Sequence, residues 1–201
     1  MNDLEKIVSL YNERVKRFGY SAESVGWKST DQQLLRFKIL TQNLDLGNQT
    51  LLDIGCGFGD LYKFLCESHS TPSQYTGIDV SDEVLKVAGQ NYRNVPGVAF
   101  FKRELMSTSP ELYDFAVASG SLNYNLDQDM SEYFEEFVEF YESRVRKGLL
   151  INLLSTKVDY RQEIHAHYSP EYAQSVFQRH FENVRLIEGY GLYEFTIQGL
   201  R

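Results

Sequence analysis

Three glycines at alternate positions, Gly55, Gly57 and Gly59, follow a short apolar segment that contains Asp53. Glycines in such a turn allow the backbone to approach a ligand closely, because they carry no Cβ atom. The preceding sequence, TLLDI, is typical of a buried strand, and the following DLYKFLCE is typical of a helix. A strand, a glycine-rich turn and a helix begin the βαβ units that bind nucleotides. The turn is therefore a candidate nucleotide-binding loop.

The residues around this loop distinguish between classes of nucleotide. In the dinucleotide fingerprint the last position is glycine or alanine, and here that position is Asp60. The Gly-Lys-Ser/Thr sequence of a P-loop is absent from the chain. A carboxylate at Asp53 would repel a pyrophosphate and would favour a ligand that carries positive charge. The loop thus argues against NAD, although an NAD-dependent oxidoreductase stays open as an alternative.

Further polar residues follow the next predicted strands. Asp79 ends the segment QYTGIDV, at a separation from the loop where a carboxylate meets ribose hydroxyls. Glu104 follows VAFFK, and Ser119 and Gly120 follow YDFAVA. Because the carboxyl ends of parallel strands meet at one edge of a sheet, we expect these residues to surround one ligand.

The elements that must position these residues alternate between strands and helices. Residues 4–18 and 30–44 have helical spacing, with Thr30 or Asp31 as the cap of the second helix. Alternation follows, and the C-terminal strands are joined across the turn at 189–191. Strands are expected at 50–54, 74–80, 98–102, 113–119, 147–155 and twice within 183–200, and helices at 59–69, 81–92, 129–145 and 169–181. This order predicts a mainly parallel sheet with helices on both faces.

The composition limits the classes of partner. The chain has 201 residues and a net charge of −8, which argues against broad binding of nucleic-acid phosphates and of anionic membranes. Cys56 and Cys66 have neither disulfide-framework nor zinc-ligand spacing. No secretion signal or membrane-spanning run is recognisable. We therefore expect a cytoplasmic protein without a metal, a nucleic-acid partner or a membrane partner, and the sequence carries no signal for an oligomeric state.

Four segments match known motifs in order and spacing. LLDIGCGFGDL, YTGIDVS, FFKREL and YDFAVASGSLNY resemble the motifs of class I S-adenosylmethionine-dependent methyltransferases over roughly residues 50–124. The resemblance implies one domain over 1–201, with a helical N-terminal cap (1–48) and a Rossmann-like core (49–201). This α/β core would hold a seven-stranded, mostly parallel sheet with an antiparallel C-terminal strand pair. The cofactor would be S-adenosylmethionine, and the reaction an in-line transfer of its methyl group to a small molecule.

The resemblance also assigns roles around the cofactor. The backbone at Gly55 and Gly57 would lie against its amino-acid and ribose part, and Asp53 would join the polar network of that loop. Asp79 would bind the ribose hydroxyls. The adenine would contact Val80, Glu104 and Leu105, and the sulfur would lie near Ser119 and Gly120. Small bacterial members look similar around VGWKSTDQQLLRF, which places Trp27 and Arg36 at the cofactor, with Arg36 pairing with its carboxylate.

The acceptor is expected between the turn after the fourth strand, the loop after the fifth and the N-terminal cap, which contributes Trp27. Asn123, Tyr124 and Tyr168 are candidate substrate contacts or catalytic groups, and His165 is preferred to His167 as a general base. The segment SLNY lacks the prolines of methyltransferases that act on planar nitrogen, which argues against such an acceptor. A catalytically idle, cofactor-binding regulatory subunit remains an alternative to an enzyme.

Overall fold

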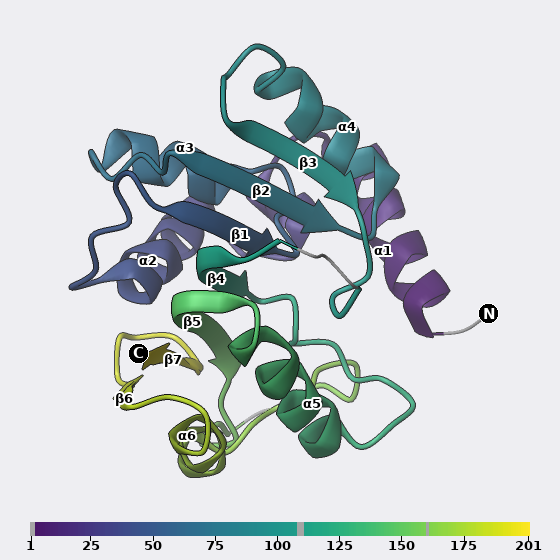
Figure 1. Ribbon diagram of the computed structural model, residues 1–201. Helices are drawn as coiled ribbons and strands as arrows, with labels where there is room; N and C mark the ends of the chain where they lie inside the picture. Colours follow the sequence, from purple (N-terminus) through teal and green to yellow (C-terminus); the bar gives the residue numbers. More distant parts are fainter. Residues whose placement is uncertain (1–2, 108–110, 160) are drawn as a thin grey trace.

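A seven-stranded sheet in the order β3-β2-β1-β4-β5-β7-β6 forms the centre of the protein (Figure 1). The computed structural model describes residues 3–107, 111–159 and 161–201. The strands are β1 (Thr50–Ile54), β2 (Gln74–Asp79), β3 (Val98–Lys102), β4 (Tyr113–Ser119), β5 (Val145–Leu154), β6 (Asn183–Ile187) and β7 (Glu194–Leu200). β1 to β5 pair in parallel, whereas β7 is antiparallel to both β5 and β6. The predicted fold class is confirmed, and β7 alone reverses the direction of the sheet.

Helices cover both faces of this sheet. They are α1 (Asp3–Phe18), α2 (Thr30–Thr41), α3 (Asp60–Glu67), α4 (Asp82–Asn91), α5 (Met130–Glu142) and α6 (Pro170–Gln178), with a short 3-10 helix η1 (Ala22–Val25) after α1. Consecutive residues of β1 point to opposite faces. Leu52 joins the core beneath α5 and α6, while Leu51 joins the core beneath α2 and α3. The two hydrophobic cores thus hold the strand ends in fixed positions.

The N-terminal helices pack against different parts of the protein. Phe37 and Leu40 of α2 belong to the core that also contains residues of α3, so α2 packs against the sheet. Its N-cap is Ser29, whose hydroxyl accepts from the Gln32 amide at 3.3 Å. The predicted cap at Thr30 or Asp31 was wrong, because the helix starts one residue earlier and both residues lie inside it. Residues of α1 and η1, such as Tyr11 and Val25, also line the cavity at the strand ends.

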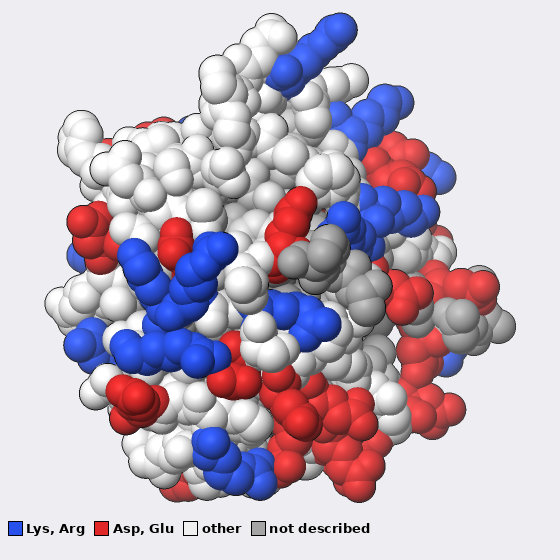
Figure 2. Space-filling model, in the orientation of Figure 1, with Lys and Arg blue, Asp and Glu red and all other residues white. Residues whose placement is uncertain are grey.

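The acidic stripe of α5 faces outward. Phe134, Phe137 and Val138 are fully buried, whereas Glu132 and Glu136 are exposed. Figure 2 shows acidic side chains gathered over this helix. The stripe is a solvated helix face. None of the described helices combines the length and the apolar character needed to cross a membrane.

Candidate functional site

A cavity of about 690 Å³ lies at the carboxyl ends of the strands. Its wall includes every residue predicted to contact the cofactor: Trp27, Arg36, Asp53, Gly55, Gly57, Asp79, Val80, Glu104, Leu105, Ser119 and Gly120. It also includes three of the four residues predicted to face the acceptor, namely Asn123, Tyr124 and His165. The fold therefore brings these residues together at one site, while their contacts with a ligand stay predictions.

The glycine loop needs glycine for its conformation and for its packing. Gly55 and Gly57 have φ angles of 74° and 54°, in the left-handed region that disfavours residues with a Cβ atom. A Cβ on Gly55 would lie 2.5 Å from the Cβ of Ser121, and one on Gly57 would lie 3.1 Å from a methyl group of Val25. The loop is thus shaped by its protein neighbours as well as by any ligand.

Asp79 connects the loop after β1 to the loop after β2. Its carboxylate accepts from the Gly57 amide and from the Ser81 amide, each at 3.0 Å. Burial raises the pKa of this carboxyl, and the two amide hydrogen bonds oppose that effect. Since a carboxylate has about four lone-pair sites, Asp79 keeps acceptor capacity for ligand hydroxyls.

Asp53 lies deeper, at the bottom of the same half of the cavity. Its carboxyl is buried and accepts a hydrogen bond from the Tyr75 hydroxyl. Burial raises the pKa of Asp53 to about 7, the hydrogen bond from Tyr75 opposes this, and the charge of Asp79 adds to it. A positively charged group in the cavity would favour the ionised form of Asp53.

Residues that follow β3 and residues of α5 line the same cavity. Glu104 is exposed, whereas Leu105, Met130 and Tyr133 are partly buried against the hydrophobic core. Burial and the nearby Glu104 raise the pKa of Tyr133 to about 12. Met130 and Tyr133 were not predicted as site residues, because their spacing on α5 also fits the apolar face that packs against the core.

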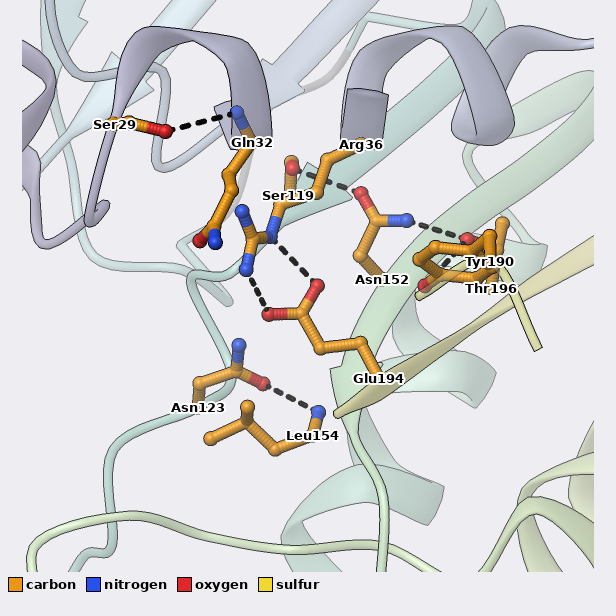
Figure 3. Close-up of polar contacts among 10 residues, drawn as sticks. All are labelled: Ser29, Gln32, Arg36, Ser119, Asn123, Asn152, Leu154, Tyr190, Glu194 and Thr196. Carbon is orange, nitrogen blue, oxygen red and sulfur yellow. Dashed lines mark hydrogen bonds and ion pairs between the residues drawn. The ribbon is translucent and has the colours of Figure 1, made fainter. Parts of the chain in front are cut away.

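Trp27, Arg36 and Glu194 form a cluster on the other side of the cavity. Arg36 donates through Nε to Glu194 Oε2 at 2.7 Å and through Nη2 to Oε1 at 2.6 Å (Figure 3). The guanidinium lies 4.2 Å from the centre of the Trp27 ring. The structure therefore pairs Arg36 with a protein carboxylate rather than leaving its charge free for the carboxylate of the cofactor. Glu194 was missed, since an isolated glutamate at a strand start carries no sequence signal.

In the wall predicted to face the acceptor, the two histidines are held by backbone carbonyls. His165 Nδ1 lies 3.1 Å from the Asn123 carbonyl oxygen, and His167 Nδ1 lies 3.1 Å from the His165 carbonyl oxygen. A carbonyl oxygen can only accept, so each Nδ1 carries the hydrogen and each Nε2 keeps its lone pair. Both imidazoles line the cavity, and burial lowers the pKa of His167. Both histidines are consequently arranged to accept a hydrogen bond or a proton at Nε2.

The two other polar candidates of this wall are already engaged in hydrogen bonds. Asn123 Oδ1 accepts from the Leu154 amide at 3.1 Å, and Tyr124 accepts from Arg14 Nη1 at 2.9 Å. Both side chains are buried and line the cavity. They hold the wall in place, and Arg14 also connects Tyr124 to α1.

Tyr168 is placed differently from its prediction. It is not among the residues that line the cavity, and its side chain is buried in the core beneath α5. Its hydroxyl donates to the Leu122 carbonyl at 2.9 Å. The bridge between Ser155 and Tyr168 fixes the backbone so that the ring packs against Phe134. Tyr168 is therefore a structural residue. Among the described residues no cluster of His, Cys, Asp or Glu is suited to hold a metal ion.

Known proteins resemble the chain in sequence and in fold. The sequence model of the family described as "Methyltransferase domain" matches residues 52–142. A putative methyltransferase of Mycobacterium tuberculosis, Rv1506c, is 28% identical over 151 residues, which cover 72% of this chain and 89% of that protein.

Two solved structures illustrate the likeness in fold. Magnesium protoporphyrin IX methyltransferase from Synechocystis, solved with S-adenosylhomocysteine, superposes with a TM-score of 0.71 at 14% identity, covering 99% of this chain and 100% of the other. The N-methyltransferase NodS from Bradyrhizobium japonicum superposes with a TM-score of 0.69 at 14% identity, covering 100% and 99%. At this identity the structures establish the fold. Together with the motifs at the strand ends and the match to the family model over residues 52–142, they support a class I S-adenosylmethionine-dependent methyltransferase.

Proposed function

We propose that this methyltransferase transfers the methyl group of S-adenosylmethionine, by in-line displacement, to a small-molecule acceptor. The observation that carries the proposal is one continuous cavity that joins buried carboxylates on one side to two histidines with free Nε2 atoms on the other. The cofactor would supply a methyl group bound to a positively charged sulfur.

The donor set of the first half fits that cofactor. Asp53 and Asp79 are buried carboxylates beside a glycine loop, and the loop itself contains no lysine or arginine that would attract a phosphate. In the proposed site Asp79 binds the ribose hydroxyls and Asp53 balances the positive charge of the amino-acid part. Val80, Glu104 and Leu105 face the adenine, and Ser119 and Gly120 face the sulfur.

His165 is the proposed general base. Because its Nδ1 hydrogen is held by the Asn123 carbonyl, Nε2 can take the proton from an acceptor hydroxyl as that oxygen attacks the methyl carbon. The new O–C bond forms while the C–S bond breaks, and the electron pair of that bond stays on sulfur. Tyr124 and Asn123 keep the imidazole in position, through the backbone bridge between Tyr124 and His165 and the carbonyl contact. Holding the reacting groups in line supplies much of the rate.

A small acceptor is consistent with the size of the cavity, which also has to hold the cofactor. Several proteins of the same fold are methyltransferases of small molecules by their names, among them the magnesium protoporphyrin IX enzyme.

The test combines binding with turnover. Calorimetry should show binding of S-adenosylhomocysteine but not of NAD, and labelled methyl groups should move from S-adenosylmethionine into a small-molecule extract. His165→Ala should lower transfer by about 100-fold or more, the usual contribution of a general base, without changing the affinity for S-adenosylhomocysteine. His180→Ala, outside the cavity, is the matched control. Binding without any transfer would instead support the idle regulatory subunit.

A further inference from the structure

We propose that the methyl acceptor is an uncharged molecule that carries a hydroxyl group and binds over the ends of β5 and β7, between the Arg36–Glu194 pair and Tyr193. This inference rests on the proposed function. Arg36, Glu194 and Tyr193 all line the cavity, and the pair is shown in Figure 3.

The position of the pair places it beyond the half of the cavity proposed for the cofactor. Glu194 is the first residue of β7 and lies opposite Leu154, the last residue of β5. In the sheet order, β7 is three strands from β1, which carries Asp53. With about 4.8 Å between neighbouring strands, this corresponds to roughly 14 Å. A molecule over β5 and β7 would thus approach the cofactor from the side of its sulfur.

The pair itself is electrically neutral. Glu194 occupies Nε and Nη2 of Arg36 in a two-point contact, and both side chains are buried. Glu194 therefore compensates the charge of Arg36, while Arg36 Nη1 is buried without a hydrogen-bond partner in the described structure and stays available as a donor. Among the described residues that line the cavity, the other cationic residue is Lys28, which is exposed, and the remaining charged residues are carboxylates. A carboxylate or phosphate on the acceptor would meet net repulsion in this wall.

The hydrogen-bonding groups around the pair favour an uncharged partner with hydroxyl groups. Gln32 and Asn123 contribute amides, and His165 and His167 contribute free Nε2 atoms that need a hydrogen donor. An acceptor hydroxyl can give its hydrogen to one of these nitrogens. In Figure 3 the side chains of Gln32 and Asn123 come from α2 and from the loop after β4 to the region of the pair.

Tyr193 adds an apolar surface at the opening of the cavity. Its side chain is 68% exposed, although aromatic residues are usually well buried. Its backbone is fixed, because the Tyr193 carbonyl accepts from the Ser155 amide at 3.0 Å. An exposed ring on a fixed backbone beside the cavity offers a flat face to a ring or chain of the acceptor.

The experiment determines the charge of the acceptor directly. A small-molecule extract is passed over anion and cation exchangers to give anionic, cationic and uncharged fractions. Each fraction is incubated with the full-length protein and S-adenosylmethionine labelled in its methyl group. We expect at least tenfold more label in products of the uncharged fraction than of either other fraction. More label in the anionic or the cationic fraction would overturn the inference and leave the proposed function intact. If no fraction accepts label, the proposed function fails and the inference fails with it.

Two variants then test the residues. Glu194→Gln should lower transfer to the uncharged fraction at least tenfold, with the affinity for S-adenosylhomocysteine changed less than threefold. Because that variant leaves Arg36 buried without compensation and can cost the fold, Tyr193→Ala provides the second test. It should raise the KM for the acceptor fraction several-fold with kcat and cofactor affinity unchanged. Phe101→Ala, an exposed aromatic outside the cavity, is the matched control. Equal loss of cofactor binding in Glu194→Gln, or unchanged KM in Tyr193→Ala, contradicts the proposal.

Discussion

The buried carboxyl of Asp53 should make cofactor binding depend on pH. Its pKa is raised to about 7 in the ligand-free protein, chiefly by burial. A positively charged amino-acid group beside Asp53 favours the ionised carboxylate, so binding should release a proton wherever Asp53 is protonated beforehand. Affinity should therefore rise with pH across the neutral range.

The size of the effect follows from the ionised fraction. With a pKa of about 7, roughly 9% of Asp53 is ionised at pH 6 and about three quarters at pH 7.5. If the ligand binds only the ionised form, the apparent affinity falls in proportion to that fraction. S-adenosylhomocysteine should thus bind about eightfold more tightly at pH 7.5 than at pH 6, with about 0.9 protons released per molecule bound at pH 6.

The Asp53 carboxyl has the opposite effect on the stability of the ligand-free fold, which should fall as pH rises. Its pKa is raised from 3.8 to about 7, so the folded state favours the protonated form. The stabilisation is fully present below about pH 4 and is lost as pH rises through about 7, amounting at most to about 4 kcal/mol at 1.4 kcal/mol per pKa unit. The ligand-free protein should lose stability over this interval, and bound S-adenosylhomocysteine should reduce that loss.

Calorimetry in two buffers of different ionisation enthalpy measures both the affinity and the number of protons released. Asp53→Asn is the decisive variant, because it keeps the shape of the side chain and removes its titration. In this variant the affinity should be nearly constant between pH 6 and 7.5. Equal affinity of the wild type at both pH values, or an unchanged pH dependence in Asp53→Asn, would refute the reasoning.

Two substitutions test other parts of the cofactor half. Asp79→Asn should weaken binding of S-adenosylhomocysteine by about 1.5–3 kcal/mol, the scale of a hydrogen bond to a charged group. Asp82→Asn, an exposed position outside the cavity, should leave the affinity unchanged. Calorimetry at constant pH measures both affinities. Gly120→Ala would place a Cβ 2.4 Å from Cη2 of Trp27 at a φ of 81°. Backbone strain of about 1–3 kcal/mol and displacement of the Trp27 indole should weaken cofactor binding and shift the fluorescence of this single tryptophan. An unchanged spectrum with unchanged affinity would show that the close packing is not needed.

The architecture, and the gathering of the predicted cofactor residues around one cavity, could be predicted from the sequence for physical reasons. The strands alternate with helices, and the glycine loop and Asp79 follow strands at fixed separations, so the parallel topology alone brings them to one edge. Such local patterns can be recognised without knowledge of tertiary contacts. The N-cap at Ser29 was missed by one residue, which is the usual uncertainty at a helix boundary.

The acceptor half could not be predicted in the same way. Glu194 reaches Arg36 across 158 positions of the chain, and no local spacing encodes that pairing. The sequence placed Tyr168 with Asn123 among the substrate contacts, yet the backbone bridge to Ser155 turns its ring into the core. Which side of an irregular loop faces a cavity depends on such long-range contacts, whereas the ends of parallel strands face one edge by construction.

In the proposed site, the two halves of the cavity differ in charge for one electrostatic reason. A site for a ligand with positive sulfur and ammonium groups is stabilised by nearby carboxylates such as Asp53 and Asp79, and this attraction weakens when methyl transfer removes the charge from sulfur. An uncompensated arginine beside that sulfur would oppose binding. Glu194 removes the conflict, because it neutralises Arg36 while the guanidinium still stacks on Trp27 and holds α2 against the start of β7. In the proposed site, a neutral acceptor half next to an acidic cofactor half would bind the charged cofactor before transfer and hold its product less tightly afterwards.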